Sequence, residues 1–141
     1  MNIVKATRRF EEWLCLHTHI VKEDLHFKHK EMACGAFPFL RATYYRWAQV
    51  WPEICDEIAK APRVISIGDL HVENFGTWRD AEGRLIWGVN DFDEAGAMPY
   101  TNDLVRLAAS AILAIGEDKL ALKGKTACDA ILEGYEASLE K

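Results

Sequence analysis

The chain has 141 residues, a formal net charge of −5, and a composition that is 50% hydrophobic and 11% aromatic. This length suits one globular domain with a sizeable core, so we expect a single domain over residues 1–141. The acidic balance argues against nucleic acid or an anionic membrane as the main partner, because both select for basic surfaces. Neither a signal peptide nor a span of membrane length is present, which predicts a cytoplasmic protein. Four widely spaced cysteines predict reduced, mostly buried thiols.

The first 62 residues are predicted to be helical. Apolar residues recur with helical spacing over residues 3–25, which indicates one amphipathic helix. Gly35 and Pro38, within "CGAFPF", predict a break between this helix and the next. A second helix follows, and Pro52 is expected to restart it as a shorter segment that ends before Pro62.

Residues 63–90 are predicted to form the β portion. The sequence "RVISIG" is short and β-branched, which is typical of a buried strand at residues 64–67. The segments "FGTW" and "RLIWGV" flank the turn-rich "RDAEG" and predict a β-hairpin. Trp78 and Trp87 are expected to pair across this hairpin.

Two further helices are predicted after the hairpin. The first has Thr101 or Asn102 as its N-cap, and the second runs from about Lys119 to the end, loosened near Gly124. Helices, then a strand, a loop and a hairpin, then helices again predict the α+β class.

Polar residues cluster where two of the predicted strands end. Asp69 follows the first strand, Asn74 comes five residues later, and Asp91 leaves the second strand of the hairpin. Carboxylates that are brought together repel each other, so such a pair usually shares a proton or binds a divalent ion. Amide and carboxylate oxygens suit Mg²⁺, whose coordination substrate phosphates often complete. The pattern therefore favours phosphoryl transfer.

Simpler interpretations stand beside this one. Asp69 and Asn74 alone would more often form a turn, because such side chains bond their own backbone. For His71 we favour a structural role under the loop over a catalytic one. Of the N-terminal histidines, only the pair His26 and His29 has helical spacing for a shared metal, and this signal is weak. Arg8, Arg9 and the two glutamates after them are expected to form an exposed helix face.

The ordered motifs resemble known kinases. Asp69-x-x-x-x-Asn74, followed by Asp91-Phe92, is similar to the catalytic loop and the Asp-Phe-Gly segment of the protein-kinase and aminoglycoside-phosphotransferase superfamily. A closer resemblance is to the uncharacterised bacterial family called domain of unknown function 2252. Its motifs correspond to "FPFLRA", "GDLHVENFG", "NDFDEA" and "DLVRLAAS" here, and the likeness covers roughly residues 28–115.

The resemblance implies a kinase-like core of the C-lobe type with roles for particular residues. Asp69 would be the catalytic base or orienting group for an acceptor hydroxyl. Asn74 and Asp91 would hold Mg²⁺, with Asp93 as an extra ligand, so that Asn74 also contributes to binding Mg²⁺-ATP. Asp103 would support the loop through hydrogen bonds, as would His71.

By the same resemblance, Arg41 would be the phosphate clamp, because a guanidinium fork matches phosphate oxygens. The substrate would be a small molecule.

Residues 1–60 contain no Gly-rich loop and no strand lysine of a nucleotide-covering lobe, so the chain resembles a truncated or minimal member. Two other functions therefore stay open. The first is a non-catalytic relic or binding module, for which dimerisation could cover apolar helix faces in a homo-oligomer. The second is a two-metal phosphoesterase, since Gly-Asp-x-His also opens such motifs, although no histidine follows His71.

Overall fold

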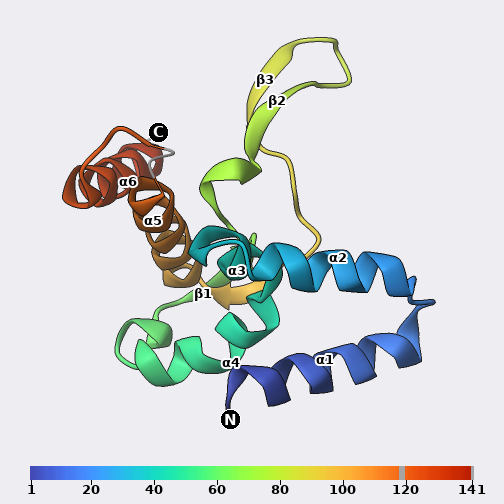
Figure 1. Ribbon diagram of the computed structural model, residues 1–141. Helices are drawn as coiled ribbons and strands as arrows, with labels where there is room; N and C mark the ends of the chain where they lie inside the picture. Colours follow the sequence, from blue (N-terminus) through green and yellow to red (C-terminus); the bar gives the residue numbers. More distant parts are fainter. Residues whose placement is uncertain (118–119, 141) are drawn as a thin grey trace. The chain divides into compact units, whose positions relative to one another are not determined.

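The computed structural model describes residues 1–117 and 120–140. These residues form a mixed α+β fold with six α-helices and two antiparallel sheets of two strands each (Figure 1). The chain divides into two compact units, Met1–Asp56 and Glu57–Lys141. The single domain expected over residues 1–141 stays a prediction. In the described part of the chain, no helix has both the length and the apolar character needed to cross a membrane.

The first unit is entirely helical. Its elements are α1 (Ile3–His17), α2 (Lys22–Met32), α3 (Ala36–Ala42) and α4 (Tyr44–Ile54). Helix α1 contacts α4, where the ring of Phe10 stacks on that of Tyr45 with centroids 4.2 Å apart. The Tyr45 hydroxyl and the Thr7 hydroxyl share a hydrogen bond of 2.8 Å. Burial raises the pKa of Tyr45 above its ordinary value.

The single helix predicted over residues 3–25 is wrong, because α1 ends at His17 and α2 begins at Lys22. Between them, Thr18 and Val21 have extended backbone. Both residues are β-branched and favour this conformation, so the helix is interrupted here without glycine or proline.

The effects predicted for the two prolines of the first unit differ from those in the structure. The predicted break at "CGAFPF" is confirmed at Gly35, because α2 ends at Met32 and Gly35 is the N-cap of α3, but Pro38 lies in the first turn of α3 and interrupts no helix. In the first turn a backbone N–H has no acceptor within the helix, so proline costs little there. Pro52 does not restart a helix either, since α4 continues through it to Ile54.

The second unit contains all the strands. Its elements are the 3₁₀ turns η1 (Ile58–Lys60) and η2 (Val72–Asn74), the strands β1 (Arg63–Ser66), β2 (Phe75–Arg79), β3 (Leu85–Val89) and β4 (Gly96–Pro99), and the helices α5 (Thr101–Gly116) and α6 (Gly124–Leu139). Strand β1 pairs with β4, and β2 pairs with β3. In Figure 1 the β2–β3 hairpin projects away from the β1–β4 sheet. Helices α5 and α6 pack together, with the rings of Tyr100 and Tyr135 stacked at 5.6 Å.

The predicted strand and hairpin are confirmed, but two details are wrong. Strand β1 is not buried, because it pairs with β4 alone and Ile65 is 89% exposed. The predicted pair of Trp78 and Trp87 does not form. Trp78 lies opposite Ile86, and Trp87, the residue after Ile86, points to the other face of the hairpin. There the ring of Trp87 stacks on that of Phe75 at 6.5 Å.

The helix predicted after the hairpin is confirmed, but the predicted N-cap residue is wrong. Helix α5 begins at Thr101 with Tyr100 as N-cap, and the Thr101 hydroxyl donates to the Ile58 carbonyl oxygen at 2.7 Å. The predicted start of the last helix, Lys119, lies outside the described residues, and α6 begins at Gly124. The thiols are free, as expected, but Cys15 and Cys34 are exposed.

Candidate functional site

The loop that follows β1 is held by the first turn of α5. Gly68 has a φ of +89°, a conformation that L side chains rarely adopt. The Asp103 carboxylate accepts hydrogen bonds from the backbone N–H of Ile67 at 2.7 Å and of Gly68 at 3.0 Å. Asn102 donates from Nδ2 to the Gly68 carbonyl oxygen at 3.3 Å. The turn before Asp69 therefore has its backbone groups bonded to one helix.

The Asp69 side chain is held by a buried arginine on the same helix. Arg106 donates from Nε to Oδ1 of Asp69 at 2.9 Å, and its Nη2 forms an ion pair with the same oxygen. The Arg106 side chain is 1% exposed and that of Asp69 is 21% exposed. The carboxylate thus lies at the edge of the protein interior, with a fixed cation on its inner side.

The remainder of the loop is closed by bonds to its own backbone and to α5. The backbone N–H of His71 donates to Oδ1 of Asn74 at 2.7 Å, and both residues are buried. The N–H of Val72 donates to the hydroxyl of Ser110 at 3.1 Å. Asn74 thereby fixes the shape of the turn that leads into β2.

The hairpin returns the chain to the same loop. The backbone N–H of Asn90 donates to the carbonyl oxygen of Asn74 at 3.0 Å, so Asp91 leaves β3 beside the start of β2. Oδ1 of Asp91 accepts the N–H of Asp93 at 3.3 Å, which forms a local turn.

These bonds shape a hollow of about 180 Å³, called here the acidic hollow, which is lined by Ile67, Asp69, Asp91, Asp93 and Glu94.

The acidic hollow has the chemistry of a cation site. Its charged lining residues are all carboxylates, whose repulsion a nearby cation would relieve. In residues 1–117 and 120–140, no group of three or more His, Cys, Asp or Glu side chains is arranged so that it could hold a metal ion. Mg²⁺ does not need such a group, because it commonly binds one or two carboxylates together with waters and substrate phosphates. One or two of these carboxylates could therefore bind Mg²⁺ only together with waters and a phosphate ligand.

The predicted site residues are distributed as follows. Asp69, Asp91 and Asp93 line the acidic hollow. Asn74 does not line it, and its side-chain oxygen bonds to the loop. Arg41 lies exposed on α3 in the first unit, and its part as a phosphate clamp stays a prediction.

Sequence reasoning missed three residues of this region. Glu94 lines the acidic hollow, while Arg106 and Ser110 hold the loop from α5. Arg106 interrupts the apolar run "LVRLAAS" three residues after Asp103, on the same helix face. A charge at such a position needs a buried partner, and this was the signal available.

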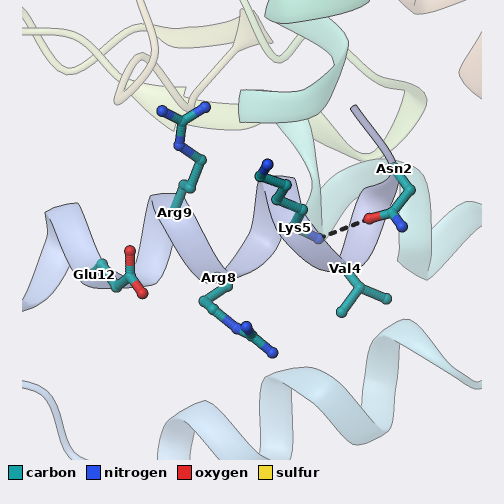
Figure 2. Close-up of a pocket in the computed structure, with 6 residues that line it drawn as sticks. All are labelled: Asn2, Val4, Lys5, Arg8, Arg9 and Glu12. Carbon is teal, nitrogen blue, oxygen red and sulfur yellow. Dashed lines mark hydrogen bonds between the residues drawn. The ribbon is translucent and has the colours of Figure 1, made fainter.

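Two hollows also occur in the first unit. One of about 460 Å³ runs along α1 and is lined by Asn2, Val4, Lys5, Arg8, Arg9 and Glu12. Figure 2 shows the side chains of Arg8 and Arg9 pointing to opposite sides of the helix, so these cations do not converge on one ligand. Of the predicted exposed helix face, Arg8, Arg9 and Glu12 are exposed, but Glu11 is half-buried and pairs with His29.

The other hollow in the first unit, of about 370 Å³, lies among α1, α2 and α3. His29 lines it and pairs through Nε2 with Glu11 at 2.5 Å. The weak prediction of a metal shared by His26 and His29 has no support in these contacts, because the described side chains include no cluster of three metal-ligating groups.

Comparison with protein-family models gives a match over most of the chain. A family model described as "Uncharacterized protein conserved in bacteria (DUF2252)" matches residues 20–141. No curated protein and no solved structure matches the chain. The matched segment includes the loop, the hairpin and α5, and thus every residue of the acidic hollow.

Proposed function

This chain belongs to the DUF2252 family, and we propose that it is a phosphotransferase-like domain that uses Mg²⁺ and ATP to phosphorylate a small molecule. The observation that carries the proposal is the acidic hollow itself. Asp69 from the loop and Asp91 and Asp93 from the end of the hairpin line one space of about 180 Å³. Their ordered spacing resembles that of the small-molecule kinases, so the shared lining and the resemblance support the same chemistry.

Each residue has a stated part in the proposed reaction. Asp69 orients the acceptor hydroxyl and accepts its proton as phosphoryl transfer proceeds. Asp91 and Asp93 hold Mg²⁺, which when bound neutralises charge on the phosphates. Asn74 as a further ligand of this ion stays a prediction, because its amide oxygen accepts a hydrogen bond from His71 and the residue does not line the acidic hollow. The part of Arg41 as a phosphate clamp stays a prediction, as do the kinase-like fold, the cytoplasmic location and a homo-oligomeric state.

A substitution at Asp69 tests the proposal. We expect Asp69→Asn to abolish ATP turnover while leaving the affinity for Mg²⁺-ATP nearly unchanged, because the amide keeps the shape of the side chain but cannot take a proton. Turnover would be followed as ADP release in the presence of a panel of hydroxyl-bearing small molecules, and affinity by calorimetry. Asp129→Asn, which removes an exposed carboxylate of α6, is the control and should behave as wild type. Equal turnover in Asp69→Asn and wild type would refute the assigned role.

A non-catalytic binding module is the second candidate. The observation that favours it is that Asp69 is bonded to Arg106 and Asn74 to its own loop, so both side chains also serve the structure. A module of this kind would bind Mg²⁺-ATP or another partner without releasing ADP under any condition. The two-metal phosphoesterase lacks support, because no histidine follows His71 to supply the further ligands.

A further inference from the structure

Helix α5 presents one polar face to the loop that follows β1. This face, called here the polar stripe, consists of Asn102, Asp103, Arg106 and Ser110, which recur at helical spacing. Side chains of the polar stripe are bonded to the loop at Ile67, Gly68, Asp69 and Val72. Most of these bonds are to backbone groups, and they account for the shape of the loop.

Arg106 differs from the other members of the polar stripe, because it contacts a side chain of the proposed catalytic site. Like Asn102 and Ser110 it is buried, with 1% of its side chain exposed, but unlike them it carries a charge. Removing a guanidinium from water costs several kcal/mol even when it is paired, and apolar residues often replace buried ion pairs with no loss of stability. A buried arginine is therefore a costly way to fill this position. The contact with Asp69 explains why an arginine, and not an apolar residue, occupies this buried position.

We propose that Arg106 is a positioning residue that fixes the Asp69 carboxylate in one orientation at the acidic hollow. Two nitrogens of the guanidinium, Nε and Nη2, meet the same oxygen, Oδ1. Because the guanidinium is planar and buried, the two contacts together restrict rotation of the carboxylate more than one contact would. The catalytic consequence rests on the proposed function, whereas the positioning itself does not.

The chain offers a matched control. Arg84 also donates from Nε to an aspartate, at 2.7 Å to Oδ2 of Asp80, but its side chain is 68% exposed. Exposed ion pairs of this kind contribute little, because water competes for both partners. Arg84→Met therefore removes the same chemical contact without removing a buried one.

The first measurement follows the Asp69 side chain directly by NMR. Three-bond couplings about χ1 of Asp69 should report a single rotamer in the wild-type protein and in Arg84→Met. In Arg106→Met they should report averaging over rotamers, because the buried fork is gone. If Arg106→Met does not fold, Arg106→Lys serves instead, since lysine keeps the charge but lacks the fork. An averaged Asp69 in the wild type, or a single rotamer in the folded variant, would overturn the inference.

The second measurement separates positioning from simple support of the fold. In Arg106→Met we expect kcat for ATP turnover to fall about 10- to 100-fold, because a misplaced catalytic group costs rate. The KM for ATP should change by less than about threefold, since the residue does not contact the nucleotide in this assignment. An unchanged kcat, or a change confined to KM, would contradict the catalytic consequence. If the wild type neither binds nor turns over Mg²⁺-ATP, the proposed function fails, and the χ1 couplings still decide whether Arg106 positions Asp69.

Discussion

At the scale of single residues, Gly68 allows the loop to turn toward α5. Its φ of +89° places it where a Cβ atom is unfavourable, and its N–H and carbonyl oxygen are both bonded to α5. The Asp103 carboxylate accepts the N–H of Gly68, Asn102 donates to the Gly68 carbonyl oxygen, and the position of Asp103 in the first turn of α5 favours its negative charge. The direction in which Asp69 leaves the strand therefore depends on one glycine.

Substitution of this glycine gives a prediction. Gly68→Ala should lower the free energy of unfolding by roughly 1–2 kcal/mol, because alanine is strained at this φ. Gly134→Ala is the control, since it lies within α6 and has no atom within 4 Å of an added Cβ. There alanine should raise stability by about 0.5–1 kcal/mol through helix propensity. Urea denaturation measures both, and equal effects of the same sign would contradict the account of Gly68.

The turn of the hairpin provides a prediction on pH. The side-chain hydrogen bond from Arg84 holds the pKa of Asp80 below its ordinary value. Because the folded pKa is the lower one, the carboxylate stabilises the turn at pH values above the unfolded pKa. This contribution is lost as the pH falls through the folded pKa. Arg84→Ala should raise the midpoint of the Asp80 titration, followed by NMR of the side-chain carbon, and an unchanged midpoint would contradict the assignment.

At the scale of elements, α5 organises the loop along most of its length. Ser110 is fully buried, accepts the N–H of Val72 at 3.1 Å and donates to the carbonyl oxygen of Leu107 at 2.7 Å. The contact extends the attachment of the loop beyond the first turn of the helix. The loop and α5 are thus one structural unit with Asp69 at its centre.

This attachment can be measured. Ser110→Ala should lower the free energy of unfolding by about 1–3 kcal/mol, because the N–H of Val72 loses its acceptor in a buried place. Ser138→Ala is the control, since Ser138 makes the same kind of bond, to Tyr135, on an exposed part of α6. Its effect should stay within about 0.5 kcal/mol. A loss at Ser110 no larger than that at Ser138 would show that the loop is held elsewhere.

The sequence predicted elements whose signals are local. The hairpin follows from turn residues between two β-rich segments, and α5 follows from its apolar period. Strand β4 was missed, because "GAMP" contains glycine and proline and no β-branched residue. Its strand conformation depends on pairing with β1, which is a contact between distant parts of the chain.

The candidate site was also predictable only in part. The convergence of Asp69 and Asp91 could be predicted, because each follows a strand end in a motif of fixed spacing. The bonds of Asn74 and Arg106 could not, because they depend on where α5 and the loop meet. Motif spacing thus indicates which residues are brought together, and packing decides which of their atoms are already bonded.

At the scale of the whole molecule, electrostatics sets a condition on the ligand. The chain has a net charge of −5, and the charged residues that line the acidic hollow are all carboxylates. These negative charges would repel a bare nucleotide, but they would not repel a nucleotide that carries a divalent cation. Binding should therefore require Mg²⁺ and should fail when a chelator removes it.

Thermal unfolding with millimolar ATP, with and without Mg²⁺, tests the central claim most directly. We predict that the two together raise the Tm of the wild-type protein, because a ligand that binds only the folded state stabilises it. ATP alone should not, and the double variant Asp91→Asn, Asp93→Asn should lose the shift while Asp129→Asn keeps it. No shift in the wild type, or the same shift in the double variant, would contradict a Mg²⁺-nucleotide site at the acidic hollow.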